Sequence, residues 1–179
     1  PKGLSRLALA DMNPVPWRNG AGVTCPVAEA TEDGVTLWRV SLAEITQAAP
    51  FSRFDGMDRV ATLAAGGPVT LAGPEMRWAL CEPGDQAIFP GEWTLSNQAP
   101  DAPAFIWNVM TQRGRAQALV RVVGTGEHVL AAQSNSFVWV MAGEAEVRGR
   151  GLPPGMVLHA QDGLQCTNMD QSLILNVIG

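Results

Sequence analysis

Two arginines and a serine are placed where they could hold a small anion. Strand alternation in Leu37–Ile45 (LWRVSLAEI) puts Arg39, Ser41 and Ala43 on one face and the larger apolar side chains on the other. Arg59 opens another short apolar run further along the chain. A guanidinium offers a planar fork of N–H donors that matches a carboxylate. These residues predict a carboxylate site, and the alternative is that Arg39 faces solvent.

Aromatic and amide side chains could complete such a site. Phe51 and Phe54 precede Arg59 and are predicted to anchor their loop to the core. Asn108 lies in the strand-length run IWNVM and carries neutral donors and acceptors that could orient a ligand. Its counterpart in a weak internal repeat, Asn176, leaves a structural role for Asn108 equally open.

The segment Asn13–Val27 (NPVPWRNGAGVTCPV) has neither a helical period nor a clean strand alternation. Its prolines fix the chain direction and its glycines allow tight turns. We expect Trp17 to wall a pocket or an interface and Arg18 and Asn19 to offer donors; the alternative is a plain surface turn. The predicted ligand-binding residues are therefore Trp17, Arg18, Asn19, Arg39, Ser41, Phe51, Arg59 and Asn108.

The residue inventory argues against a metal centre and against common catalytic sites. First-row metals favour clusters of imidazole and carboxylate ligands, but the chain has 2 histidines, His128 and His159, and the candidate ligand His159, on a predicted strand, has Asp162 nearby. Neither a phosphate-binding loop nor a Gly-x-Ser-x-Gly elbow occurs. We therefore predict no bound metal, no cofactor and no assigned catalytic residue.

Composition limits the partners. The net charge is -5, and the 12 lysines and arginines are scattered, so the chain lacks the basic stripe of a nucleic-acid-binding protein. No apolar run approaches the roughly 20 residues that span a bilayer, the start shows no secretion signal, and the 3 cysteines are widely spaced. We expect a cytoplasmic protein with free thiols that binds neither nucleic acid nor membranes. The oligomeric state stays open, and a homodimer is allowed.

The elements that must position these residues are short strands. The 19 glycines and 13 prolines separate apolar runs of strand length throughout the chain. The best helical candidate, Glu127–Asn135 (EHVLAAQSN), is short. This pattern predicts an all-β fold, either a sandwich or a barrel.

A weak internal repeat indicates a duplicated β unit. Glu82–Asn97 aligns without gaps with Pro153–Asn168, sharing a proline, a glycine and the final asparagine, and each is followed by a similar strand, IWNVM or ILNVI. The order of strands and turns resembles a cupin, a small antiparallel barrel of the jelly-roll type. The resemblance implies a bicupin, a double-stranded β-helix fold with two barrels. Residues 1–112 would form the first barrel with an N-terminal strand and loop segment, and residues 113–179 a smaller second barrel.

Four segments together resemble the HutD/Ves family. They are Pro16–Thr24 (PWRNGAGVT), Trp38–Ile45 (WRVSLAEI), Phe51–Arg59 (FSRFDGMDR) and Asn108–Gly114 (NVMTQRG), in the order typical of that family over the first two thirds of the chain. The resemblance implies a metal-free bicupin linked to histidine utilisation. It also implies a role in restraining that pathway by sensing a small acidic intermediate, for which urocanate and N-formylglutamate are the candidates.

The chain departs from the family pattern at two places. Cys25 and Pro26 stand where the family usually has Arg-Glu, and Ile106 stands where it usually has Asp. If these positions line the pocket, its polarity has changed.

Three functions are compatible with the sequence. The first is a non-enzymatic metabolite-binding regulator. The second is a metal-free cupin enzyme, an isomerase or hydrolase that anchors a carboxylated substrate on Arg39 and Arg59 and uses a carboxylate as base. The third is a structural or interaction module whose interior is filled with side chains. A cavity would argue against the third function, and turnover would separate the first two.

Overall fold

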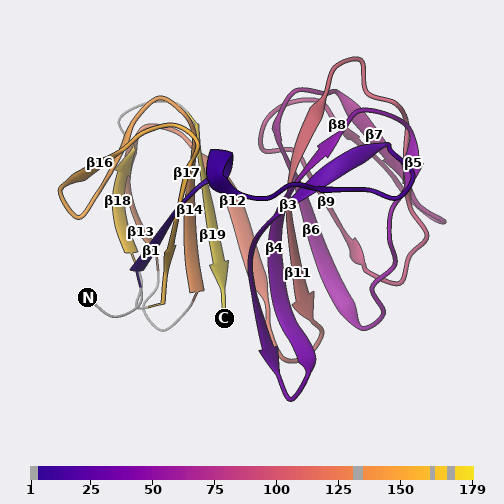
Figure 1. Cartoon of the computed structure of the whole chain (residues 1–179), viewed down its shortest axis with the longest axis horizontal. Coiled ribbons are helices and arrows are strands. Elements are labelled where there is room, and N and C mark those ends of the chain that lie inside the picture. The colour runs from indigo at the N-terminus through magenta and orange to yellow at the C-terminus, as the bar shows by residue number, and fades with distance from the viewer. Residues whose placement is uncertain (1–3, 131–134, 162–163, 169–171) are drawn as a thin grey trace. The chain divides into compact units, whose positions relative to one another are not determined.

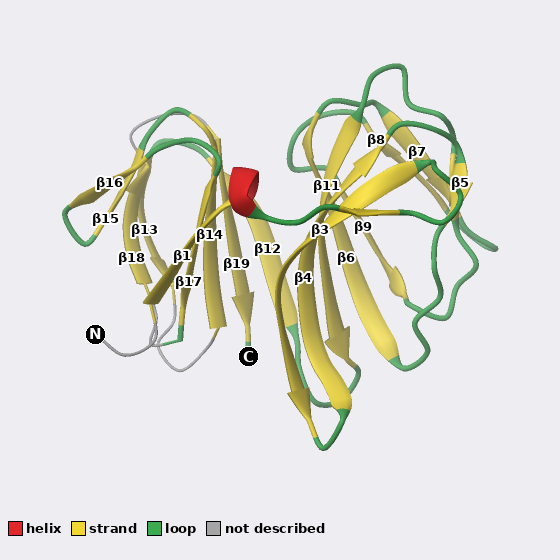
Figure 2. Cartoon of the chain, viewed as in Figure 1, coloured by secondary structure: helices red, strands yellow, loops and turns green. Residues whose placement is uncertain are grey.

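The computed structural model describes residues 4–130, 135–161, 164–168 and 172–179. The regular elements of the described residues are strands joined by loops, with one 3₁₀ turn, η1 (Leu9–Asp11), among them (Figure 2). The all-β prediction is confirmed. In these ranges no helix is long and apolar enough to cross a membrane.

The chain divides into two compact units (Figure 1). One unit is Asn13–Gln117, here called the pocket unit, and the other combines Pro1–Met12 with Ala118–Gly179, here called the composite unit. The expected division is into 1–112 and 113–179. In the structure the boundary between the units falls after Gln117, and residues 1–12 are grouped with the C-terminal part of the chain. The first strand pairs with a strand near the C-terminus, so the start of the chain belongs to the composite unit.

The pocket unit contains two antiparallel sheets. The larger sheet has the order β2 (Val15–Pro16), β3 (Gly22–Glu32), β4 (Val35–Ile45), β11 (Ala104–Gln112), β6 (Met57–Ala65) and β9 (Gln86–Pro90). The smaller sheet has the order β5 (Ala49–Pro50), β10 (Ser96–Asn97), β7 (Val69–Ala72) and β8 (Arg77–Leu80).

The composite unit also contains two sheets. One has the order β1 (Leu4–Ala8), β17 (Met156–Ala160), β14 (Asn135–Ala142), β19 (Ser172–Ile178) and β12 (Ala118–Val123). The other has the order β13 (Gly126–Leu130), β18 (Leu164–Asn168), β15 (Ala145–Val147) and β16 (Arg150–Leu152).

The two units repeat one pairing pattern. In the pocket unit β11 lies between β4 and β6, and β6 also pairs with β9; in the composite unit β19 lies between β12 and β14, and β14 also pairs with β17. The smaller sheets match as well. In the pocket unit β10 pairs with β7 of the β7–β8 hairpin, and in the composite unit β18 pairs with β15 of the β15–β16 hairpin. Glu82–Asn97 and Pro153–Asn168, the segments of the sequence repeat, therefore occupy corresponding places.

One tight turn joins β3 to β4, the strand that carries Arg39 and Ser41. The β3–β4 hairpin closes through Asp33 and Gly34, whose φ angles are 50° and 77°, and Glu32 pairs directly with Val35. Positive φ at both central residues is the signature of a type I′ turn, which Asp-Gly favours and which matches the twist of the flanking strands. The turn therefore fixes the pairing of the first residues of β4. The register then shifts between Ala30 and Thr31, so the face that Arg39 and Ser41 occupy follows from the alternation of β4 itself.

The core of the pocket unit joins its two sheets. It combines buried side chains of the larger sheet with buried side chains of the smaller sheet and its flanking loop. Its fully buried members include Ile45, Leu63, Leu71, Leu80, Leu95 and Ile106. The composite unit has a core of its own, which includes Val138, Val140, Leu152 and Leu158. Three of the buried residues in the first core, Ala43, Ile45 and Ile106, also border the pocket described below.

The helical candidate Glu127–Asn135 is wrong as far as the structure describes it. Its first residues belong to strand β13, which pairs with β18, and Asn135 begins β14. The residues 131–134 between them lie outside the described ranges. A short apolar run carries little helical preference of its own, so pairing with a distant strand decided its conformation.

Candidate functional site

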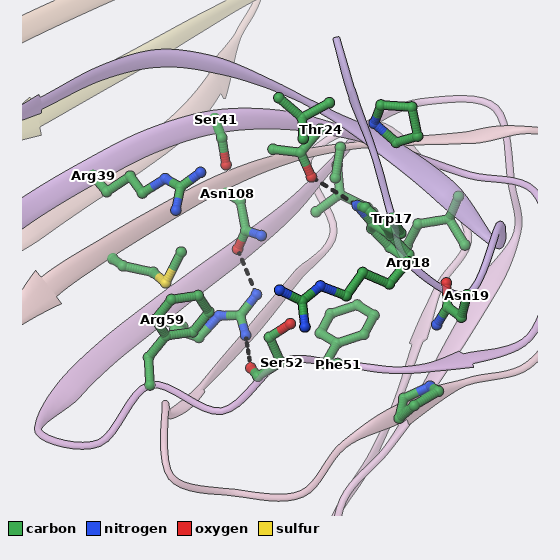
Figure 3. A pocket seen from close by; sticks show the side chains of 18 residues that line it. Trp17, Arg18, Asn19, Thr24, Arg39, Ser41, Phe51, Ser52, Arg59 and Asn108 are labelled. Carbon is green, nitrogen blue, oxygen red and sulfur yellow. Dashed lines mark hydrogen bonds between the residues drawn. The ribbon is translucent and has the colours of Figure 1, made fainter.

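A cavity of about 580 Å³ opens in the pocket unit against the larger sheet (Figure 3). This volume falls in the range of small-molecule sites, roughly 300–1,000 Å³. All eight residues predicted to bind a ligand line it. The full lining is Val15, Pro16, Trp17, Arg18, Asn19, Thr24, Arg39, Ser41, Ala43, Ile45, Pro50, Phe51, Ser52, Phe54, Arg59, Ile106, Asn108 and Met110.

Three neighbouring strands form the floor of the cavity. Because β4 and β11 are antiparallel neighbours, Arg39 stands opposite Met110 and Ser41 opposite Asn108. On the far side of β11, Met110 stands opposite Arg59 of β6. The two arginines therefore flank Met110 in one row across the sheet, and the hydroxyl and the amide occupy the next row. The expected alternation of β4 is confirmed, since Arg39 and Ser41 share the pocket face.

Arg59 is the most buried of the arginines in the pocket. Only 4% of its surface is exposed. Its Nη1 donates to the Ser52 carbonyl at 3.0 Å and its Nη2 to Oδ1 of Asn108 at 3.3 Å, while its Nε–H has no hydrogen-bond partner among the residues that the structure describes. Burial, and secondarily the like charge of Arg39, lowers the pKa of Arg59 to about 10. The side chain is still a cation at neutral pH.

Aromatic rings surround the Arg59 guanidinium. Its central carbon lies 5.3 Å from the ring centroid of Phe51, 5.5 Å from that of Phe54 and 5.2 Å from that of Phe89. A cation within about 6 Å of a ring centroid is attracted by the ring quadrupole. The rings stabilise the cation without neutralising it, so its field remains available to an anion. Phe51 and Phe54 both line the cavity, and Phe51 also packs against the core of the pocket unit.

The pocket lining has positive charge and no acid. Three arginines line it, Arg18, Arg39 and Arg59, and none of the lining residues is Asp or Glu. Among the described residues, none of these three arginines takes part in an ion pair. Arg18 starts from the turn above the sheet and extends toward the end of the pocket that holds Arg59 and Asn108 (Figure 3).

Trp17 forms a wall of the pocket, as predicted. Its indole Nε1 donates to Oγ1 of Thr24 at 2.8 Å, and its ring meets Phe51 edge-on with centroids 6.5 Å apart. A side chain at Gly22 would approach the Trp17 ring to 3.3 Å and the Glu44 carbonyl to 2.3 Å, so the indole lies where only glycine leaves room. Two residues of β2 pair with β3 and hold this segment at the sheet edge.

Asn19 has a mainly structural contact. Its Oδ1 accepts a hydrogen bond from the backbone N–H of Ala21 at 3.1 Å, and the turn is closed by Trp17 and Gly22 through a 2.9 Å backbone bond. Its side chain lies apart from the converging arginines (Figure 3). Asn19 borders the cavity, but its side-chain acceptor serves the turn.

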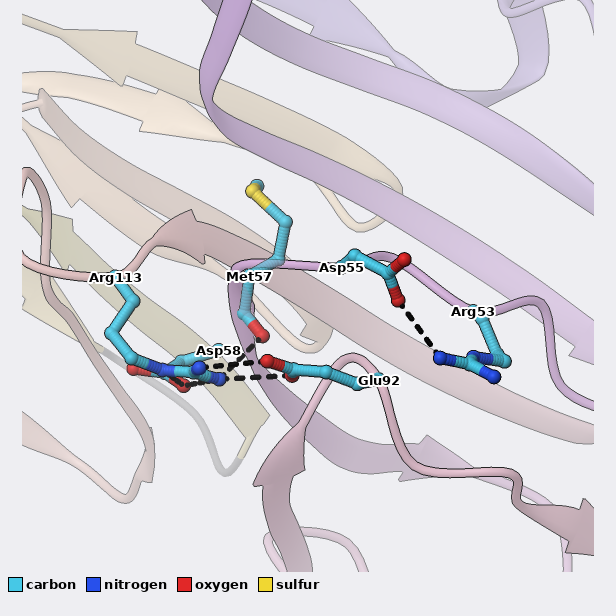
Figure 4. Close-up of polar contacts among 6 residues, drawn as sticks. All are labelled: Arg53, Asp55, Met57, Asp58, Glu92 and Arg113. Carbon is cyan, nitrogen blue, oxygen red and sulfur yellow. Dashed lines mark hydrogen bonds and ion pairs between the residues drawn. The ribbon is translucent and has the colours of Figure 1, made fainter.

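A clamp outside the cavity holds the loop that carries Phe51 and Phe54 (Figure 4). Arg113 donates from Nη1 and Nη2 to the two carboxylate oxygens of Glu92 at 2.7 and 2.9 Å, and from Nε to Asp58 at 2.9 Å. Backbone bonds from Phe54 N–H to the Gly91 carbonyl at 2.8 Å and from the Gly91 N–H to the Met57 carbonyl at 2.6 Å lie beside it. The Arg113 hydrogen bonds lower the pKa of Glu92 to about 2.

The list of predicted ligand-binding residues omits several lining residues that the strand period could have added. Ile106 and Met110 lie two residues either side of Asn108, and Ala43 and Ile45 continue the face of Ser41. Ser52 could not be found in this way, because it contributes a backbone carbonyl from a loop.

Only one of the two departures from the family pattern reaches this pocket. Ile106 lines it and is 1% exposed, so an apolar side chain forms that part of the floor. Cys25 and Pro26 do not line it. Pro26 instead borders a separate shallow depression together with Arg39 and Glu29.

The cysteines and histidines are accounted for outside the cavity. All three cysteines are free, and burial, with a smaller contribution from Glu44, raises the pKa of the Cys25 thiol. His159 lies 3.0 Å from Oδ1 of Asn135 and stacks on Phe137, and His128 lies 3.0 Å from the Gly124 carbonyl. In the part of the chain that the structure describes, no group of three metal-ligating side chains forms. Asp162, predicted to lie near His159, is outside the described residues.

A family model and the relatives found by sequence agree with each other. The HutD family model matches residues 9–177. Protein Ves of Cronobacter sakazakii is 29% identical over 148 residues, which is 82% of this chain and 81% of the relative. An uncharacterized 21.2 kDa protein in the hutC 3′ region of Pseudomonas putida is 29% identical over 172 residues, 90% of either chain.

Solved structures agree on the fold. HutD from Pseudomonas fluorescens SBW25 has a TM-score of 0.85 at 25% identity and covers 98% of this chain and 97% of its own. Similarity at the level of the fold alone extends to bacterial pirin YhhW from Escherichia coli, with a TM-score of 0.64 at 10% identity, 97% of this chain and 98% of that one. It also extends to oxalate decarboxylase OxdC of Bacillus subtilis, with a TM-score of 0.63 at 10% identity, 97% of this chain and 76% of that one. The chain therefore has a cupin-like fold.

Proposed function

The chain belongs to the HutD family, and from this membership and the charge of its pocket we propose that it binds a small carboxylate metabolite and thereby tunes histidine utilisation. The proposed role is regulatory, and the bound molecule is released unchanged. Urocanate and N-formylglutamate are the candidates that the family resemblance supplies.

One observation supports the proposal above all others. Arg59 is buried beside Arg39, has an unpaired Nε–H and lies in a pocket with no acidic lining residue. A buried charge without a partner is costly, because it loses hydration without gaining a counter-charge. A bound carboxylate would supply both the missing counter-charge and the missing hydrogen-bond acceptors, and the uncommitted amide nitrogen of Asn108 and the Ser41 hydroxyl lie beside it.

The link to histidine utilisation is supported by names of relatives. One solved relative is named HutD, and one sequence relative is named by its place in a hutC 3′ region. We extend this association to the present chain, for which it is a proposal. The net charge of -5 favours action through a ligand or a protein partner in the cytoplasm over direct contact with nucleic acid or membranes.

We also propose that each unit is one cupin barrel, which makes the chain a bicupin. The repeated pairing pattern of the two units supports this description. The barrel in the pocket unit would then contain the ligand. In a purely structural or interaction module, side chains would fill this space. The cavity removes the main argument for a purely structural module.

Calorimetry on single arginine variants tests the carboxylate site. We expect urocanate or N-formylglutamate to bind the wild type, and Arg59→Met or Arg39→Ala to weaken binding by about 2–5 kcal/mol, as for one half of a buried charge pair. Arg77→Ala is the matched control, because Arg77 is an exposed arginine of the same unit outside the pocket. Unchanged affinity in folded Arg59→Met and Arg39→Ala would place the site elsewhere.

Incubation with the same compounds separates binding from catalysis. An isomerase or hydrolase of the kind considered from the sequence needs a side-chain base near the ligand, and the described lining contains no Asp, Glu, His, Cys or Lys. We expect nuclear magnetic resonance spectra of either compound to stay unchanged in the presence of the protein. Product formation that is lost in Arg59→Met would favour the enzyme instead.

A further inference from the structure

The three floor strands of the pocket, β4, β11 and β6, separate their polar and apolar side chains into two ends. Arg39, Met110 and Arg59 form one row across β4, β11 and β6, and Ser41 and Asn108 form the next. Successive rows on one face are about 7 Å apart, because each strand residue rises about 3.3 Å. All the donors of the sheet floor therefore lie within two rows at one end.

The following rows contain no polar side chain on the central strands. Ala43 stands opposite Ile106, and Ile45 stands opposite Ala104 in the row after that. Ile45 and Ile106 are 0% and 1% exposed and line the cavity, so this end is deep as well as apolar.

Aromatic walls enclose the apolar end from above. Trp17 packs against the surface left free by Gly22, which pairs with Ile45, and its indole N–H is already bonded to Thr24. Phe51 meets the indole edge-on. The Trp17 donor is therefore occupied by the protein, and the ring presents an apolar face to the cavity (Figure 3).

From this separation we infer that the pocket takes an amphipathic monocarboxylate, with the carboxylate between Arg39 and Arg59 and an apolar or planar tail against Ile106, Ile45 and Trp17. The inference rests on the proposed function, since it adds a tail subsite to the carboxylate site. A ligand with a second charge at the far end would bury that charge beside Ile106. The hydroxyl of that row, Thr24 of β3, already accepts a hydrogen bond from Trp17, and no cationic side chain stands in the row. Of the two candidate metabolites, urocanate has a planar tail, whereas N-formylglutamate carries a second carboxylate.

A ligand series on the unaltered protein tests the tail subsite directly. Calorimetry would compare propionate with hexanoate, which differ in tail length, and hexanoate with adipate, which share six carbons but differ in a second carboxylate. We expect affinity to rise about fourfold for each methylene that is buried. We expect adipate to bind at least about tenfold more weakly than hexanoate, because its second charge would lose hydration unpaired.

Two variants assign the effect to the apolar end. Ile106→Thr places a hydroxyl in the floor and should reduce the preference for hexanoate over propionate, while propionate binding stays near its wild-type value. Ile88→Thr is the matched control, because Ile88 is 62% exposed on β9 and does not line the cavity. Trp17→Leu, which shortens the wall, gives a second test should Ile106→Thr fail to fold.

The outcomes distinguish the tail subsite from the carboxylate site. If propionate, hexanoate and adipate bind equally and Arg59→Met abolishes all binding, the carboxylate site stands and the tail subsite is refuted. Tighter binding of adipate than of hexanoate refutes the tail subsite as well. If none of these acids binds and neither urocanate nor N-formylglutamate binds, the proposed function fails together with the inference.

Discussion

Arg59 is stabilised by ring faces and neutral acceptors. Phe51, Phe54 and Phe89 lie within 5.5 Å of its guanidinium carbon, and the Ser52 carbonyl and Asn108 accept from its Nη atoms. An aspartate in place of these contacts would stabilise the arginine more strongly but would also cancel its attraction for an anion. These neutral partners hold the guanidinium in one orientation and do not neutralise its positive charge. A carboxylate can therefore still be attracted to it.

At the same scale, Gly22 decides the position of Trp17. Gly22→Ala would bring a methyl group to 2.3 Å from the Glu44 carbonyl and 3.3 Å from the indole ring. We expect this overpacking to destabilise the protein by about 1–3 kcal/mol and to move the indole. Thermal melting and tryptophan fluorescence measure the two effects. Gly73→Ala is the control, since its nearest neighbours would lie at an ordinary 3.5 Å; equal melting temperatures for both variants would contradict the prediction.

At the scale of elements, the pocket depends on a loop that the sheet does not hold by itself. The chain between β5 and β6 carries Phe51 and Phe54, and the clamp of Arg113 with Glu92 and Asp58 ties its end to two neighbouring segments (Figure 4). Single exposed ion pairs contribute little, but a bidentate arginine within a network is the favourable case. The clamp thus positions the rings around Arg59 from outside the cavity.

The clamp predicts a specific pH dependence. The pKa of Glu92 is lowered to about 2 in the folded protein, so its contribution is present above its ordinary pKa of 4.5 and is lost as the pH falls from there toward 2. We expect Glu92→Gln to lower the melting temperature at pH 7, and this difference from the wild type to shrink as the pH approaches 2. Glu75→Gln, an exposed carboxylate of the same unit outside the ion pairs, is the control. A Glu92→Gln difference that is the same at every pH would refute the clamp.

The strands around the pocket could be predicted because their signals are local. The alternation of β4 is read within its eleven residues, and it places Arg39 and Ser41 on the correct face. The clamp could not be read in this way, because Arg113 meets partners 21 and 55 residues away, and exposed charges carry no period. The strand conformation of Glu127–Leu130 likewise depends on pairing with β18, about forty residues further along the chain, so it could not be read from the local sequence.

At the scale of the whole molecule, the two units share one strand-pairing pattern but differ in the side chains that their strands place inside. In the pocket unit β6 carries Arg59 at the cavity, whereas its counterpart β14 contributes Val138 and Val140 to an apolar core. The cavity of about 580 Å³ is found in the pocket unit. The pattern of strands is thus separable from the site, which is made by a few side chains and one loop.

The composite unit includes a strand from the opposite end of the chain. Leu4–Ala8 pairs along its length with Met156–Ala160, so deleting residues 1–8 would leave the outer edge of β17 without hydrogen-bond partners. We expect faster amide hydrogen exchange at β17 in the deletion variant. Ser5→Ala is the control, because it changes an exposed side chain and keeps the β1 backbone. Unchanged exchange at β17 would show that β1 contributes nothing to that edge.

The unpaired charge of Arg59 has a consequence for how long the protein survives. A ligand that binds only the folded state stabilises it by mass action, by about 2.7 kcal/mol at a hundred times its dissociation constant. Proteases cut the open state, and when opening and closing are fast the rate of cutting follows its population. A cell that supplies the carboxylate would then degrade this protein about a hundredfold more slowly than one that lacks it. The amount of the protein in the cell would then rise with the supply of the metabolite, even if the protein were synthesised at a constant rate.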